Sequence, residues 1–149
     1  LRSETSYTDK FRTRSGADQE WNEYAGDYFY NRVKSNNTID WTKCNCSASS
    51  GFRYFSPVKD QCWDIDVECN MPEVETASFG TGANKLGSVT IHDVSVGYKT
   101  SWNGNIRVGV NNAFDKKPEV YAPNVQSGTD PSTYDVVGRR VFGAIKLRF

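Results

Sequence analysis

The sequence predicts an all-β fold in which the last four antiparallel strands of a transmembrane β-barrel are joined by long extracellular loops. Three observations predict it. The final segment alternates between apolar and cationic positions, an Asn-Gly turn joins two further alternating segments, and long polar stretches without any period separate the strands. No stretch approaches the roughly 18 uninterrupted apolar residues of a membrane helix, so any membrane contact has to come from strands.

The last strand, at about 137–149, has one apolar and one cationic face. Uncharged residues occupy every second position back from Phe149, and the positions between them hold Arg148, Lys146 and Arg140. Successive side chains of a strand point to opposite faces. Outer-membrane barrels use such strands with the apolar face toward lipid and an aromatic residue at the interface. The alternative is a sandwich strand with one face in water.

The segments 88–100 and 105–112 form the clearest hairpin. Asp93 and Lys99 share one face of the first strand, whereas Val94, Val96 and Tyr98 share the other. Val89 and Ile91 are out of phase with this pattern, which predicts a β-bulge near His92. The turn is SWNGN at 101–105. On the second strand, Arg107 lies on the face opposite the apolar residues.

The first strand is predicted at about 1–14, and the remaining segments are predicted loops. Residues 15–87 contain all four cysteines and show no sustained period, and residues 113–136 contain three prolines. Four strands joined by a long loop, a short turn and a long loop place both long loops on one side. This asymmetry is typical of outer-membrane barrels, whose long loops are extracellular.

The cysteine-rich loop suggests disulfides. Cys44, Cys46, Cys62 and Cys69 are an even number within a short span, and a bond between Cys44 and Cys46 would be strained. Two pairings remain open, Cys44–Cys62 with Cys46–Cys69 or Cys44–Cys69 with Cys46–Cys62. Zinc is a weaker alternative because its ligands usually come in more regular pairs.

Aromatic residues crowd the same loop. They could stack on a sugar or an aromatic ligand, or form a small core of the loop itself, which is the favoured interpretation. The candidate ligand-binding residues are Trp21, Tyr24, Tyr28, Trp41 and Trp63. Asp64, Asp66 and Glu68 could share a strand face, but alternating acids on a wet face are common and no metal site is predicted.

Composition excludes several function classes. Lys and Arg number 18, as do Asp and Glu, and the basic residues form no run, so nucleic acid is not an expected partner. The sequence contains no nucleophile elbow, metal-binding histidine pair, phosphate loop or dinucleotide motif. We therefore expect neither an enzyme nor a cofactor.

Two linked motifs, VNNAFDKKP at 110–118 and YDVVGRRVFGAIKLRF at 134–149, resemble the C-terminal end of TonB-dependent outer-membrane receptors. The matching positions are Asn112, Phe114, Asp115, Lys116, Pro118, Tyr134, Gly138, Arg139 and Phe149. Ala113 stands where a larger aliphatic residue is usual. The resemblance covers 88–149 well, 1–14 weakly and the cysteine loop not at all.

The resemblance implies a piece of a Gram-negative outer-membrane receptor. Such receptors have a 22-stranded barrel around a plug domain that is absent here, and they import a scarce nutrient with energy relayed by TonB and its inner-membrane complex. The expected nutrient is a ferric siderophore, cobalamin, carbohydrate or peptide. Four strands cannot close a barrel, so we expect a C-terminal fragment of a longer chain. The other expected partners are outer-membrane lipid and the barrel assembly machinery, which would recognise Phe149.

Within this interpretation one set of charged residues lines the barrel lumen. The set is Asp93, Lys99, Arg107, Arg140, Lys146 and Arg148. The main alternative is a secreted, disulfide-braced β domain that binds carbohydrate or protein. A third is an oligomeric barrel to which each chain gives four strands, although such assemblies use short connections.

Overall fold

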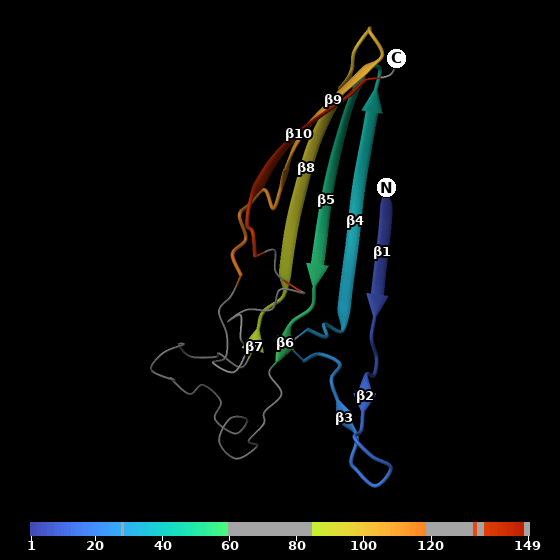
Figure 1. Cartoon of the computed structure of the whole chain (residues 1–149), viewed down its shortest axis with the longest axis vertical. Coiled ribbons are helices and arrows are strands. Elements are labelled where there is room, and N and C mark those ends of the chain that lie inside the picture. The colour runs from blue at the N-terminus through green and yellow to red at the C-terminus, as the bar shows by residue number, and fades with distance from the viewer. Residues whose placement is uncertain (28, 60–84, 119–132, 134–135, 148–149) are drawn as a thin grey trace, which may run out of the picture.

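The computed structural model contains one antiparallel sheet of six strands (Figure 1). It describes residues 1–27, 29–59, 85–118, 133 and 136–147, and within these ranges the regular structure is entirely β. The sheet follows the order of the chain, so each strand pairs with the long strand before and after it. Its members are β1 (Arg2–Tyr7), β4 (Val33–Lys43), β5 (Cys46–Phe55), β8 (Val89–Lys99), β9 (Gly104–Asn111) and β10 (Arg140–Leu147).

Two of these strands correct the sequence analysis, which predicts one loop over 15–87 and four strands in all. β4 and β5 lie inside that segment and pair without interruption from Lys34↔Phe55 to Lys43↔Cys46. The connection between them is the tight turn at Cys44 and Asn45, where Cys44 has the left-handed φ of 53°. Serine, asparagine and threonine fill both strands, so their alternation between apolar and polar positions is weak in the sequence.

The connections divide the sheet into two unlike ends. Both tight turns, at 44–45 and 100–103, lie at one end, which we call the turn end (Figure 1). The long connections, 8–32, 56–88 and 112–139, leave the strands at the other, the long-loop end. Short two-residue strands pair there, β2 (Arg12–Thr13) with β3 (Asn22–Glu23) and β6 (Val58–Lys59) with β7 (Lys85–Leu86). The predicted separation of long loops from short turns is confirmed and extends over five connections.

The hairpin β8–β9 turns through the predicted Asn-Gly pair. The amide of Thr100 donates to the carbonyl of Gly104 at 2.9 Å, and the amide of Gly104 donates to the Thr100 hydroxyl at 2.8 Å. Asn103 has φ 59°, a conformation that asparagine tolerates better than most residues. A Cβ on Gly104 would lie 2.4 Å from the Trp102 ring, so only glycine fits that position.

The bulge predicted near His92 is wrong for the pairing of β8 with β5, which continues from Val89↔Phe55 to Cys46↔Tyr98. The irregularity lies instead where β8 pairs with β9. Asn112, just past β9, has φ 51°, and the next amide, that of Ala113, donates to the His92 carbonyl at 2.7 Å.

A small core lies at the long-loop end. Val89 and Ile91, the residues out of phase in the sequence, are fully buried, and Ala25 and Val58 are buried as well. Burial of their side chains therefore explains why β8 departs from simple alternation.

Buried polar groups join the long connections to one another. The Asn31 amide donates to the Ser56 carbonyl at 2.8 Å, and the Thr133 hydroxyl donates to the Asn31 side-chain oxygen at 2.9 Å. All three residues are buried. One asparagine thus links the segments that precede β4, follow β5 and precede β10.

Candidate functional site: the two faces of the sheet

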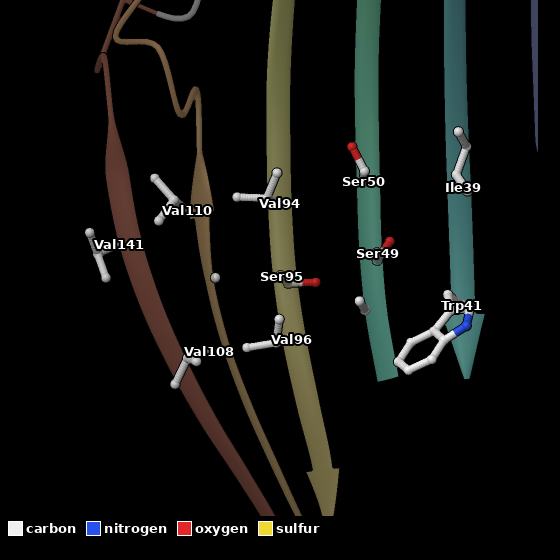
Figure 2. Close-up of a pocket in the computed structure, with 12 residues that line it drawn as sticks. Ile39, Trp41, Ser49, Ser50, Val94, Ser95, Val96, Val108, Val110 and Val141 are labelled. Carbon is white, nitrogen blue, oxygen red and sulfur yellow. The ribbon is translucent and has the colours of Figure 1, made fainter. Parts of the chain in front are cut away.

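One face of the sheet is apolar across five strands. The register aligns Val94, Val110 and Val141 in one row and Trp41, Ala48, Val96 and Val108 in the next. Figure 2 shows these apolar side chains following one another from β4 across β8 and β9 to β10. They are exposed, with Val141 at 79% and Ile145 at 70%. We call this surface the apolar face, and its members are Ile39, Trp41, Ala48, Val94, Val96, Tyr98, Ile106, Val108, Val110, Val141, Ile145 and Leu147.

The apolar face has the height of a membrane-facing band. From the row of Leu147 to the row of Phe52 and His92 the register advances by four two-residue steps. At about 3.4 Å per residue this is about 27 Å along the strands. With the usual tilt of about 35–45° the height becomes about 20 Å, close to the apolar band of about 25 Å in outer-membrane barrels.

Aromatic rings lie within the band and at its boundary toward the long-loop end. Tyr98 occupies the second row from the turn end, and Trp41 occupies the middle row with Val96 and Val108. At the boundary toward the long-loop end the His92 ring lies between Phe52, at 6.2 Å between centroids, and Phe114, at 5.0 Å in an edge-on arrangement. Trp41 is therefore part of the apolar face on β4. The hypothesis that it joins a ligand-binding loop with Trp21 and Tyr24 is not supported.

The opposite face is polar and carries the charged residues predicted to share one surface. The register places Lys99 and Lys146 in one row, both next to Asn105, and places Arg107 between Gly97 and Ala144. Asp93 and Arg140 belong to the same face by strand alternation. We call this surface the polar face. On β1 this face continues with Arg2 and Glu4. Sequence reasoning missed its β4 and β5 members, which include Lys34, Asp40 and Arg53, because it predicted no strands there.

Ion pairs organise the polar face near the long-loop end. Arg53 Nε lies 3.3 Å from a carboxylate oxygen of Asp93, and the other Asp93 oxygen accepts the amide of Asn112 at 2.8 Å. Arg107 instead donates through Nε and Nη2 to the Ser95 hydroxyl, at 3.1 and 2.8 Å. Between these groups Phe142 lies over Gly109, where a Cβ would approach the ring to 2.5 Å.

The motif residues Asn112, Asp115 and Arg139 form one brace between β9 and β10. The fully buried Asn112 side chain accepts the amide of Lys116 at 2.8 Å and donates to the Lys116 carbonyl at 3.0 Å. The Asp115 carboxylate then accepts the amide of Arg139, just before β10, at 3.0 Å. The brace thus fixes where β10 enters the sheet.

Charge reinforces this brace. Asp115 lies 2.9 Å from Lys117 Nζ and 3.9 Å from Arg139 Nη2. The hydrogen bond from Lys117, followed by that from the Arg139 amide, lowers the pKa of Asp115. Gly138 has φ 75°, and a Cβ there would approach the Asp115 carboxylate to 3.1 Å. Residues of the two motifs that carry the resemblance, Asp115, Gly138 and Arg139, therefore contact one another.

Tyr24, one of the candidate ligand-binding residues, lies in an aromatic cluster on the connection 8–32. Its ring centroid is 5.8 Å from Phe11 and 5.8 Å from Tyr30, and Phe11 and Tyr30 are 4.8 Å apart. Trp21 lies under the guanidinium of Arg14, at 4.6 Å from the ring centroid. The rings pack chiefly on each other, which supports the interpretation as a small core of the loop.

Glu23 on β3 stabilises the connection 8–32, which carries this aromatic cluster. Its carboxylate accepts the amide of Phe11 at 2.9 Å and Arg12 Nε at 2.8 Å. The backbone hydrogen bond from Phe11, followed by that from Arg12, lowers the pKa of Glu23 to about 2. Sequence analysis did not identify this carboxylate, because Phe11 and Arg12 are brought to it only by the pairing of β2 with β3.

No disulfide is seen among the described residues, so the predicted disulfides stay unconfirmed. Cys44 and Cys46 are free and exposed at the turn end. The connection that carries Cys62 and Cys69 leaves β5 at Phe55, nine residues and about 30 Å of extended chain away from Cys46. Cys62 and Cys69 lie outside the described residues, as do Tyr28, Trp63, Arg148 and Phe149.

Comparisons with known proteins give no relative: no family model matches the chain, and no curated protein or solved structure matches it significantly. The described part of the chain contains no helix long and apolar enough to cross a membrane. It also contains no cluster of three or more histidine, cysteine, aspartate or glutamate side chains placed to hold a metal ion.

Proposed function

We propose that this sheet is part of the wall of a β-barrel in the outer membrane of a Gram-negative bacterium, and that the barrel belongs to a TonB-dependent receptor importing a scarce nutrient. The observation that carries the proposal is an exposed apolar face across five register-matched strands of the sheet, opposite a charged polar face. In the proposal the apolar face contacts lipid and the polar face lines the lumen.

The edges of the sheet support a larger assembly. β1 and β10 are its outer strands, and each has a neighbour on only one side in the described sheet. Open strand edges favour pairing with further strands, and a barrel abolishes them by closure. In the proposal neighbouring strands of a barrel of 22 complete both edges.

The receptor class is proposed from the motif residues. Asn112, Asp115 and Arg139, which match the resemblance, lie together in the brace at the start of β10. In the proposed mechanism the long connections help to capture a ferric siderophore, cobalamin, carbohydrate or peptide outside the cell. TonB then transmits energy through a plug domain, and Phe149 guides assembly of the barrel.

A secreted β domain would use the same sheet differently. It predicts a soluble protein whose exposed apolar residues bind carbohydrate or protein, and a disulfide brace. The free thiols of Cys44 and Cys46 do not favour that brace. The exposed apolar band across five strands also exceeds what a monomeric soluble protein usually leaves in water.

Spin labels on neighbouring residues of one strand test the proposal. Ile145→Cys and Lys146→Cys, in a background without native cysteines, place a label on the apolar and on the polar face of β10. In protein folded into vesicles, we expect oxygen to relax the label at 145 and a water-soluble nickel chelate to relax the label at 146. Equal nickel access at both positions, with a protein that stays dissolved without detergent, would contradict the proposal.

A further inference from the structure

Three cations gather on the polar face at the turn end. Lys99 on β8 and Lys146 on β10 are both paired in register with Asn105, and Arg107 lies two residues from Asn105 along β9. With strands about 4.8 Å apart and about 3.4 Å per residue, their Cα atoms lie about 8 to 10 Å from one another. Side chains of this length can converge on a single small molecule.

These cations have no carboxylate partner in the described part of the chain. Arg107 donates only to the neutral hydroxyl of Ser95, and Lys99 and Lys146 form no ion pair within the described ranges. Two arginines nearer the long-loop end of the same face are paired, since Arg2 lies 2.6 Å from Glu4 and Arg53 lies 3.3 Å from Asp93. The chain has 18 acidic and 18 basic residues, so a general excess of base does not explain the difference.

The neighbouring residues leave the three charged side chains exposed to solvent. Gly97 and Ala144 flank Arg107 in its row, and both lack a side chain that could cover it. Lys99, Arg107 and Lys146 are all exposed. Like charges this close disfavour each other, and a bound anion removes that repulsion.

We propose that Lys99, Arg107 and Lys146 form a binding site for a small molecule with several carboxylate or phosphate groups. The inference rests on the proposed function, because inside a barrel a wall of one sign focuses the potential and concentrates anions. It adds to the proposed lumen a site for a multiply charged oxyanion at the turn end, opposite the long connections. Arg107 supplies the planar donor fork that matches a carboxylate or phosphate, and the two lysines supply charge on either side.

Citrate and inorganic pyrophosphate serve as probes for the carboxylate and phosphate forms. Calorimetric titration of the full-length protein, folded in a zwitterionic detergent at low ionic strength, should show binding of at least one probe and none of glycerol. The triple variant Lys99→Gln, Arg107→Gln, Lys146→Gln should weaken that binding at least tenfold, and 0.5 M NaCl should weaken it in the original protein.

Two further variants keep the outcome decisive. Lys43→Gln removes a cation at the same end of the sheet but on the other face, and should change the affinity less than twofold. Lys99→Arg, Arg107→Lys, Lys146→Arg keeps all charges and should retain binding within about threefold. Unchanged affinity in the triple glutamine variant, or equal losses in the Lys43→Gln control, would overturn the site.

The same samples separate this proposal from the proposed function. Detergent dependence and vesicle insertion report whether the protein is a membrane barrel. A soluble protein whose triple variant loses anion binding would retain the site and overturn the barrel. An inserted barrel that binds neither probe would retain the barrel and overturn the site.

Discussion

The two ends of the sheet are stabilised in different ways. At the long-loop end, Val89 and Ile91 are buried by the chain itself, and Asn31 joins three connections through buried hydrogen bonds. At the turn end the same strands expose apolar residues on one face and, on the other, cations that form no ion pair within the described ranges. At the long-loop end, apolar side chains are buried and buried polar groups are hydrogen-bonded within the protein itself. The turn end instead requires surroundings that differ on its two faces.

The largest effect is expected from a charge on the apolar face. Val108→Arg places a guanidinium in the middle of the band, where exposure of a cation to lipid costs about 2–4 kcal/mol. Thr42→Arg, on the polar face of β4, is the control and should cost less than about 1 kcal/mol. Urea unfolding from vesicles measures both. Equal stability of the two variants would show that the faces do not have different surroundings.

The next effect concerns the long-loop end, at Asn112. Asn112→Ala leaves the amide and carbonyl of Lys116 without a side-chain partner, at a cost of about 1–3 kcal/mol. Asn112→Gly loses the same bonds but tolerates the φ of 51°, so it should be less destabilising than alanine by about 1 kcal/mol. Equilibrium unfolding of both variants separates hydrogen bonding from backbone strain. If both match the original protein, the brace does not stabilise β10.

A smaller and local effect is expected from pH at the long-loop end. The pKa of Glu23 is lowered from its ordinary 4.5 to about 2 in the folded protein, so its contribution to stability is present above pH 4.5 and is lost as pH falls toward 2. We expect the near-ultraviolet circular dichroism of the Phe11, Tyr24 and Tyr30 cluster to weaken over that interval. Glu23→Gln cannot ionise and should remove the transition at this position, while other carboxylates keep theirs.

The smallest effect is expected at the tight turn of the turn end. Cys44 and Cys46 are exposed and free, so both should react with a maleimide without prior reduction. Because neither side chain is buried, the modification should shift the free energy of unfolding by less than about 0.5 kcal/mol. Mass mapping of the labelled peptides checks the site of reaction. Protection of both thiols until a reductant is added would restore the predicted disulfides.

The sequence predicts the parts of the sheet whose pattern is local. The Asn-Gly turn and the alternation of Val94, Val96 and Val108 each lie within a few residues, and the structure confirms them. β4 and β5 could not be found in this way, because polar residues such as Ser35, Asn37 and Ser50 interrupt the apolar side of these strands, where β8 and β9 have valines. Their pairing partners, and not their own periodicity, make them strands.

The polar elements show the same limit. Asp93, Lys99 and Arg107 were assignable to one face by strand alternation alone. The bonds of Asn112 to Lys116 and of Asp115 to Arg139 depend on how β9 meets β10, which no local pattern encodes. The local sequence also did not indicate that Cys44 and Asn45 form a tight turn between two strands, and the disulfides predicted with Cys62 and Cys69 stay a prediction because those two residues lie outside the described ranges.

The linkage through Asn31 limits how the long connections can be exchanged between proteins. A connection transplanted into this sheet in place of 112–139 would have to bring an equivalent of Thr133, because otherwise the side-chain oxygen of Asn31 would lose its buried donor. Replacing the segment after β5 would meet the same requirement at the Ser56 carbonyl. The three connections are therefore coupled in stability, and an exchange of any one of them has to preserve the hydrogen bonds through which Asn31 joins it to the other two.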